Sequence, residues 1–198
     1  MNRILLLILL GLASHLARAQ RIPVVEKSLS NGFKLLLVER HNEPRIAGGW
    51  VVKVGSSNER PGITGIAHLF EHMMFKGSKN VEPESHTSII ASIGGRSNAY
   101  TTEDATVFWE TLPAQYLPLA LWLEADRMAT LRIESEAFDR EREVVKEERR
   151  MRIDNQPYGR LSEIITDHAF TTHPYKHPPI GSMADLEAAS LADVRDFH

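Results

Sequence analysis

The sequence predicts an α+β fold, because strand-like and helix-like segments are grouped along the chain rather than alternating regularly. Strand patterns come first, two short helical segments and a hairpin follow, and helical periodicity dominates from Gln115 onward. The composition is that of a globular protein, with 42% hydrophobic and 25% charged residues among 198. The formal net charge of -3 gives no reason to expect nucleic acid as a partner.

Three strands are expected in the first third of the chain. Residues 23–40 contain two apolar stretches separated by the turn sequence Ser30-Asn31-Gly32, so they predict two strands joined by a turn. After a loop at residues 41–45, residues 46–54 predict a third strand.

Two short helices and a hairpin follow these strands. Residues 64–76 predict a helix with Thr64 as a candidate N-cap and Gly77 just past its end. A second short helix is expected at residues 88–93, and a hairpin at residues 98–112.

Helices dominate the rest of the chain. Pro118 must lie near the start of the first of them, because proline is tolerated only in the first turn. Ser190 and Asp193 form a variant of the capping box at the start of the last one, which continues to His198 without a stop signal. We therefore expect the sequence to be part of a longer protein. The expected helices cover residues 115–131, 134–155, 158–170 and 190–198.

Residues 1–19 read as a secretory signal peptide, and residues 20–198 as one domain. A basic start at Arg3 precedes an apolar run at residues 4–13, and Ala17-Arg18-Ala19 matches the small-x-small cleavage pattern. The alternative, an uncleaved membrane anchor, needs about 18 apolar residues, and this run is much shorter. We expect export to the periplasm or the cell exterior, with no membrane association after cleavage.

Cysteine is absent from the sequence. This excludes disulfides, a thiolate metal site and a lipid anchor on cysteine. The fold must then depend on its hydrophobic core, and about 180 residues are enough to build one.

The expected helix at residues 64–76 contains His68, Glu71 and His72 in the order His-x-x-Glu-His. At 100° per residue these three share one narrow stripe, and the other faces are apolar, as in a buried helix. Buried polar groups need partners, and two histidines one turn apart can share a divalent metal ion such as zinc. Glu71 lies beside them, where it can accept a proton from water. The alternative is a pair of hydrogen-bonded core histidines.

A zinc site that also holds water needs a third protein ligand. The expected helix at residues 134–155 carries Glu141 and Glu148 within a face formed by its apolar residues Ala137, Phe138, Val144, Val145 and Met151. The two glutamates are seven residues apart, about 10 Å along the axis, too far to bind one ion together. One of them is expected to be the ligand and the other a supporting residue. The alternative is that both are paired with arginines.

These residues carry a resemblance to the pitrilysin/insulinase family of zinc metallopeptidases, whose signature is His-x-x-Glu-His. The resemblance covers about residues 24–198. It rests on four stretches in the family's order, "GSSNERPGITGIAHLFEHMMFKGS", "GGRSNAYTTEDATVFW", "REREVVKEERR" and "HPYKHPPIGSMADLEAASLADVRDFH".

The resemblance implies a mixed, largely antiparallel sheet covered by helices and one Zn²⁺ per catalytic domain. It assigns His68 and His72 as metal ligands and Glu71 as the general base of peptide hydrolysis. The family's third ligand is a glutamate some 75 residues after the motif, which matches Glu148, and Glu141 matches an accessory glutamate.

The resemblance also implies a substrate strand, Asn98, Ala99 and Tyr100, that pairs with an extended peptide or an unfolded segment. Phe108 and Trp109 read as hairpin core, and His173 and His177 as loop residues.

Family members have a second homologous domain, which supplies an arginine and a tyrosine to the site, and we expect it here in the same protein or in a partner subunit. The alternative function is a non-catalytic or partner-dependent binding or assembly subunit of the same fold.

Overall fold

The computed structural model describes residues 22–197, so the expected signal peptide at residues 1–19 lies outside the described residues. The chain divides into two compact units between Glu43 and Pro44. In the first unit, β1 (Val25–Ser28) and β2 (Lys34–Leu37) form an antiparallel pair, with Val25 opposite Leu37. Asn31 accepts the Phe33 N–H at 3.1 Å, and Gly32 has a positive φ of 87°. The two predicted strands and their turn are therefore confirmed.

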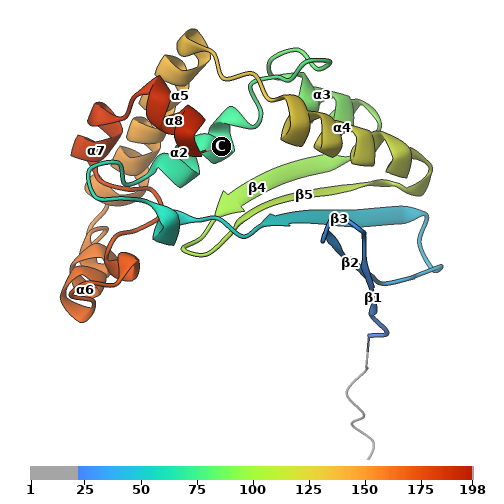
Figure 1. Ribbon diagram of the computed structural model, residues 1–198, viewed down its shortest axis with the longest axis horizontal. Helices are drawn as coiled ribbons and strands as arrows, with labels where there is room; N and C mark the ends of the chain where they lie inside the picture. Colours follow the sequence, from blue (N-terminus) through green and yellow to red (C-terminus); the bar gives the residue numbers. More distant parts are fainter. Residues whose placement is uncertain (1–21, 198) are drawn as a thin grey trace, which may run out of the picture. The chain divides into compact units, whose positions relative to one another are not determined.

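The second unit contains a three-stranded antiparallel sheet in the order β3-β5-β4 (Figure 1). The strands are β3 (Arg45–Val52), β4 (Arg96–Thr101) and β5 (Thr106–Pro113). In the central strand β5, Phe108, Glu110 and Leu112 are buried and alternate with partly buried residues. Both predictions for this sheet, the strand near residue 46 and the hairpin, are confirmed, and β4 lies at one edge.

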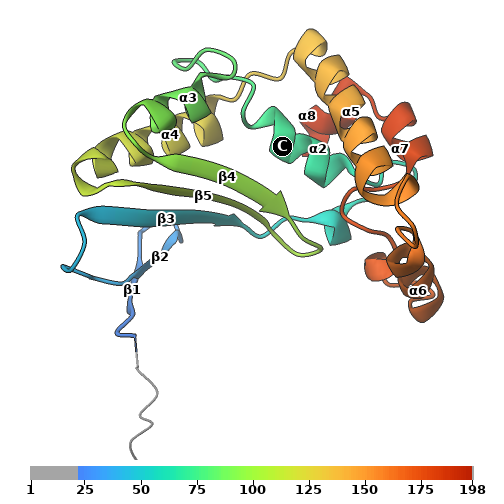
Figure 2. The same cartoon turned by 180° about the vertical axis from the view of Figure 1, so that it is seen from behind.

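Two helices, α3 (Ser85–Ser92) and α4 (Leu117–Thr130), cover one face of this sheet (Figures 1 and 2). Ile90 of α3 and Leu123 of α4 are fully buried and pack together with Val81. Pro118 lies in the first turn of α4, as predicted. Helix α3 begins three residues earlier than predicted and thereby includes His86.

A separate group of helices packs around α2 (Ile66–Met73). Its members are α5 (Ser135–Arg149), α7 (Met183–Ala188) and α8 (Leu191–Phe197). Their shared core is apolar and includes Leu69, Met73, Phe138, Val145, Leu186 and Val194. The predicted capping of α8 is confirmed, because the Ser190 N–H donates to Asp193 at 3.0 Å and the Asp193 N–H to Ser190 Oγ at 3.3 Å. The remaining α-helix within residues 22–197 is α6 (Leu161–Ala169).

The start of α2 differs from the prediction. Thr64 does not cap the helix, because its N–H and hydroxyl both bind Asp185. The first amides of α2 are instead bound by Glu59, which accepts from Gly65 N–H at 2.9 Å and from Ala67 N–H at 2.8 Å. Gly65 takes the N-cap position with φ 93°, a conformation that favours glycine.

Two helix ends and one whole helix also differ from the sequence-based expectation. Helix α2 ends at Met73, three residues before the predicted end, and Gly77 follows with φ 103°. Helix α5 ends at Arg149, and a single turn of π-helix, Arg150–Asp154, replaces its predicted last turn. The short helix α7 was not expected; the side chain of Ser182 caps it by accepting the Asp185 N–H at 3.1 Å.

Candidate metal centre

Two imidazoles lie one turn apart on α2. The ring centroids of His68 and His72 are 4.8 Å apart. Helix α2 has one polar stripe because most of its other residues are buried in the core, namely Ile66, Ala67, Leu69 and Met73. Hydrophobic burial of those side chains fixes the rotation of the helix. It therefore determines which way both histidines face.

Glu148, near the end of α5, brings a carboxylate to the two histidines. Its Oε2 atom lies 3.4 Å from Nε2 of His72 and 3.8 Å from Nε2 of His68. The three donor atoms all lie within 4.8 Å of one another. Two imidazole nitrogens and one carboxylate oxygen are a donor set that zinc favours in catalytic sites, where it also holds water.

The supporting residues around these three donors come from several elements. Glu141 lies one heptad before Glu148 on α5, and its Oε2 atom is 3.3 Å from Nδ1 of His72. Its other oxygen is 2.8 Å from Nζ of Lys76. Oε1 of Glu148 is 2.6 Å from Nη1 of Arg152, one turn further along. The carboxylates of Glu141 and Glu148 therefore each direct one oxygen toward a histidine and the other toward a lysine or arginine side chain.

Glu71 lies between the two histidines in the sequence and is 7% exposed. It accepts a hydrogen bond of 2.6 Å from the hydroxyl of Thr101, at the end of β4. Burial raises the pKa of the Glu71 carboxyl, against the opposing effect of that hydrogen bond. A carboxyl whose pKa moves toward neutrality is better suited to exchange protons at physiological pH.

The two histidines differ in their affinity for a proton. Burial, together with the neighbouring His72, lowers the pKa of His68 to about 4, so its ring is neutral. Burial opposes protonation of His72 too, but its hydrogen bonds to Glu141 and Glu148 prevail and raise the pKa of His72 to about 9. Proximity to His72 in turn keeps the pKa of Glu148 below its ordinary range. Glu141 and Glu148 thus favour positive charge at His72, and a bound cation would take the place of the proton there.

An open cleft of about 880 Å³ borders these residues. Asn98, Ala99 and Tyr100 of β4 line it, and half of the Tyr100 side chain is exposed. Val144 and Met151 also line the cleft, at 48% and 55% exposed, so the prediction that both point inward with the core was wrong. Val144 lies four residues before Glu148 and Met151 three residues after it, so both lie on the side of the helical path that borders the cleft. Residues 178–180 form a further part of the wall.

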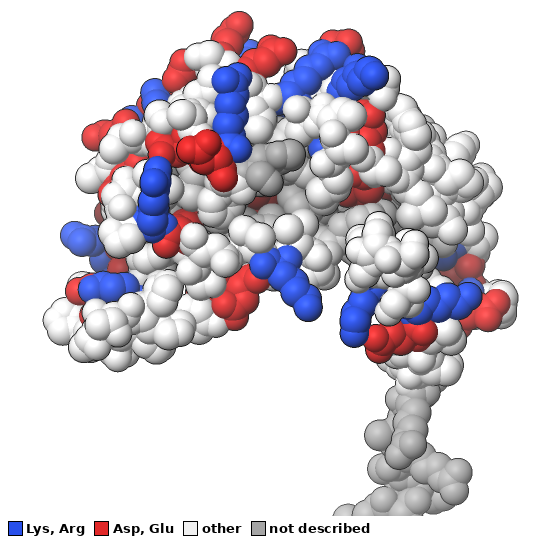
Figure 3. Space-filling model, viewed as in Figure 1, with Lys and Arg blue, Asp and Glu red and all other residues white. Residues whose placement is uncertain are grey.

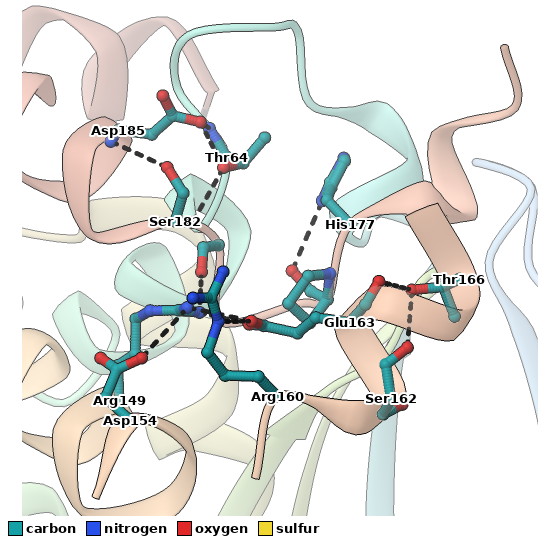
Figure 4. Close-up of polar contacts among 12 residues, drawn as sticks. Thr64, Arg149, Asp154, Arg160, Ser162, Glu163, Thr166, His177, Ser182 and Asp185 are labelled. Carbon is teal, nitrogen blue, oxygen red and sulfur yellow. Dashed lines mark hydrogen bonds and ion pairs between the residues drawn. The ribbon is translucent and has the colours of Figure 1, made fainter. Parts of the chain in front are cut away.

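Arg149 fixes this wall to the end of α5. Its guanidinium is buried and binds Glu163 of α6 at 2.6 Å and 3.2 Å, lies 3.5 Å from Asp154 and donates to the Gly181 carbonyl (Figure 4). Figure 4 also shows Thr64 turned toward Asp185 and Ser182. The backbone just beyond the cleft wall, at Gly181 and Ser182, therefore binds both Arg149, which follows Glu148, and Thr64, which lies two residues before α2.

Sequence reasoning missed several contacts of the site. Thr101, the partner of Glu71, and Lys76, the partner of Glu141, carry no local signal, because each meets its partner through the tertiary fold. Arg152 could have been found, since it lies four residues after Glu148 on the same helical path. His173 and His177 stay apart from the donor set, as expected. Nδ1 of His177 lies 3.6 Å from Glu59.

The surface is mixed in charge. On the face that Figure 3 shows, basic and acidic side chains are interspersed over the helices, without a continuous basic area of the kind that binds nucleic acid. None of the helices formed by residues 22–197 has the length and apolar character required to cross a membrane.

Comparisons with known proteins identify the family of this chain. Residues 34–182 match the family described as Insulinase (Peptidase family M16). The zinc protease PqqE of Helicobacter pylori is 37% identical over 195 residues, covering 98% of this chain and 44% of PqqE.

Two solved structures are similar to the chain. A protease from Helicobacter pylori superposes with a TM-score of 0.86 and 37% identity, covering 89% of this chain and 42% of the protease. The periplasmic protease PqqL from Escherichia coli superposes with a TM-score of 0.79 and 26% identity, covering 91% of this chain and 21% of PqqL. The chain thus spans less than half the length of the relatives it matches.

Proposed function

Since the chain belongs to the insulinase family, peptidase family M16, we propose that it supplies the zinc-binding half of a metal-dependent endopeptidase. The observation that carries this proposal is the convergence of Nε2 of His68, Nε2 of His72 and Oε2 of Glu148 beside Glu71, at the edge of an open cleft. These three residues would hold the ion, and their donor chemistry fits zinc.

Each residue has a distinct role in the proposal. A bound zinc ion supplies Lewis-acid chemistry, because it polarises a carbonyl and acidifies water. Glu71 takes a proton from the attacking water and returns it to the amine of the leaving peptide. Thr101 holds one oxygen of Glu71 in place through its 2.6 Å hydrogen bond. Glu141 orients His72 by binding its Nδ1 atom, which turns Nε2 toward Glu148.

The substrate is proposed to be an extended peptide or an unfolded segment of a protein. Strand β4 is an edge strand of its sheet, and its residues Asn98, Ala99 and Tyr100 line the cleft. An extended chain can pair with the backbone of an edge strand, and such pairing tolerates varied side chains. The cleft therefore suits recognition by main chain more than by sequence.

The complete enzyme is proposed to contain a second homologous domain or subunit. This follows from the share of the relatives that the chain covers, which is 44% for PqqE. Export is proposed on the signal-like residues 1–19, and the periplasmic description of PqqL supports it. We assign peptidase activity to the complete assembly and not to this chain alone.

The first test is the zinc content of the purified chain, measured by elemental analysis. We expect one zinc ion per chain, and loss of that ion in His68→Ala and His72→Ala variants. The second test is chelator-sensitive cleavage of an unstructured peptide by the chain combined with its second half. Zinc far below one per chain would overturn the metal assignment, and a zinc-loaded assembly without cleavage would favour a binding subunit instead.

A further inference from the structure

A second group of ionisable side chains lies away from the cleft, between the sheet and its two covering helices. His86 comes from α3, Glu110 from β5, and Glu124 and Arg127 from α4. Their relative exposures are 4%, 0%, 0% and 3%. Charged groups are almost never buried this deeply unless they are paired, so their pairing needs an account.

Arg127 is committed to Glu124. Its Nε atom donates to Oε2 of Glu124 at 3.0 Å, and its Nη2 atom donates to Oε1. The guanidinium also lies over the rings of Phe75 and Phe108, at 5.0 Å and 4.4 Å from their centroids. The positive charge of this cluster is therefore used by one of its two carboxylates.

Among the described residues, His86 is the potential cation in contact with Glu110, while the more distant Arg127 guanidinium acts on Glu110 only through its charge. Nε2 of His86 lies 3.4 Å from Oε1 of Glu110 and 3.5 Å from Oε1 of Glu124. Both oxygens of Glu110 and both ring nitrogens of His86 are buried without a well-formed hydrogen bond. Ser97 lies directly opposite Glu110 in the sheet, and its hydroxyl is unpartnered as well. Buried polar atoms left unpaired in one place require an explanation, and a bound water, ion or proton would supply one.

Charge balance identifies that species. The charged or titratable groups that face one another here are His86 from α3, Glu110 from β5, and Glu124 and Arg127 from α4; β4 contributes only Ser97. With a neutral imidazole the group carries a net charge of -1, since it holds two carboxylates and one guanidinium. A single proton makes it neutral. A divalent cation would leave a buried net charge of +1 and would compete with Arg127 for the same oxygen of Glu124.

We propose that His86 and Glu110 form a buried proton-binding site, which holds one proton between α3 and the central strand β5. The proton converts two unpaired buried groups into a hydrogen-bonded pair and removes the net charge. Because β5 pairs with β4 along residues 96–101, the site supports the strand that lines the cleft.

The site makes folding depend on pH. Burial and the nearby Glu124 carboxylate raise the pKa of Glu110 to about 8. Exposed imidazole and carboxyl groups have lost their protons above about pH 7, so the unfolded chain holds no proton at these positions there. Above about pH 7, and until the site loses its proton near pH 8, the folded chain binds one proton more than the unfolded chain. Stability is therefore retained at lower pH and lost as pH rises through this window.

The test compares urea unfolding of the full chain with that of Glu110→Gln at several pH values. Glutamine keeps the shape of the protonated acid and cannot ionise. We expect the folding equilibrium constant of the wild-type chain to fall, relative to that of Glu110→Gln, by about tenfold per pH unit between about pH 7 and 8. Glu136→Gln is the matched control, because its side chain is 88% exposed, and its profile should follow the wild type.

If Glu110→Gln does not fold, an NMR titration of the wild-type chain alone still tests the proposal. The carboxyl carbon of Glu110 in the wild-type chain should titrate above pH 6 by NMR, and a midpoint below 5 would overturn the proposal. Parallel pH profiles for the wild type and Glu110→Gln would also overturn it. Elemental analysis supplies the alternative outcome: a second metal ion per chain, lost in Glu110→Gln, would show that a metal and not a proton occupies the site.

Discussion

The Nδ1 atom of His72 lies 3.3 Å from Oε2 of Glu141, and this contact decides which nitrogen of the imidazole faces Glu148. Lys76 holds the other oxygen of Glu141 at 2.8 Å, so the orienting carboxylate is itself held in place. Groups that orient a metal-binding histidine tune affinity without touching the metal. The same contact explains why two inward glutamates, one heptad apart, are needed on a single helix.

Glu141→Gln should weaken zinc binding without abolishing it. The amide keeps an oxygen near His72 but loses the negative charge that strengthens the hydrogen bond, so we expect an affinity loss of about 10–100-fold. Competition with a zinc-binding dye measures this value. Glu143→Gln on the same helix has a 57% exposed side chain and should bind as the wild type does. Equal affinities for the two variants would show that Glu141 does not support the site.

Glu71→Gln and Glu148→Gln should separate catalysis from metal binding. Glu71 has no place in the donor set, so its glutamine variant should retain about one zinc ion per chain and lose hydrolysis in the assembled enzyme by about 100-fold or more. Glu148→Gln should lose the zinc itself. Elemental analysis and peptide cleavage, measured on the same preparations, distinguish the two. Cleavage by zinc-loaded Glu71→Gln would contradict the role assigned to Glu71.

Gly65→Ala should disturb the start of α2 and with it the metal site. Gly62 and Gly65 both have positive φ, at 92° and 93°, so alanine is strained at either position. Only at Gly65 would the new Cβ meet a neighbour, the Ile180 carbonyl oxygen at 2.6 Å; at Gly62 nothing lies within 4 Å.

We expect Gly65→Ala to lower the free energy of unfolding by about 1–3 kcal/mol more than Gly62→Ala, and to weaken zinc binding where Gly62→Ala does not. Urea unfolding and zinc titration of the two variants test this. Indistinguishable stabilities would mean that the backbone at Ile180 moves aside.

Glu59→Gln should change how stability depends on pH. Burial raises the pKa of Glu59 to about 7, although it accepts two backbone hydrogen bonds that oppose this shift. The folded chain then keeps a proton that the unfolded chain loses above its ordinary pKa of 4.5, so stability falls as pH rises from about 4.5 to 7.

In Glu59→Gln this loss of stability should be absent. The free energies of unfolding of the wild type and the variant should therefore change relative to each other by at most about 3 kcal/mol between pH 4.5 and 7. Chemical unfolding at pH 4.5, 6 and 7.5 measures it. A constant difference between the two profiles would show that Glu59 is ionised throughout, held by its two amide donors.

Local patterns predicted the elements that depend on neighbours in the sequence. Local rules predicted three features that the structure contains. These are the hairpin at residues 98–112, the position of Pro118 in the first turn of α4, and the Ser190 cap of α8. Helix α7 was missed because six residues give too little periodicity to recognise. The capping role of Thr64 was wrong because Asp185, 121 residues later, binds its hydroxyl.

Helical periodicity predicted the positions of side chains on a single helix, but it did not predict contacts between different elements. The stripe of α2 and the inward position of Glu141 and Glu148 follow from helical periodicity. The hydrogen bond from Thr101 to Glu71 joins a strand to a helix, and the His86–Glu110 contact joins a helix to a strand. Such contacts depend on register and packing angle, which the pattern of a single segment does not contain.

On the proposed function, Arg149 has a consequence for how the substrate cleft can change in evolution. It follows Glu148 directly in α5, and it holds Gly181, one residue beyond the cleft wall, and Glu163. Substitutions in the loop at residues 178–181 that admit a different substrate would therefore also shift Arg149, and with it the adjacent Glu148. If the chain acts as proposed, a change in substrate preference would also change the affinity for the ion, and we expect compensating substitutions at position 163.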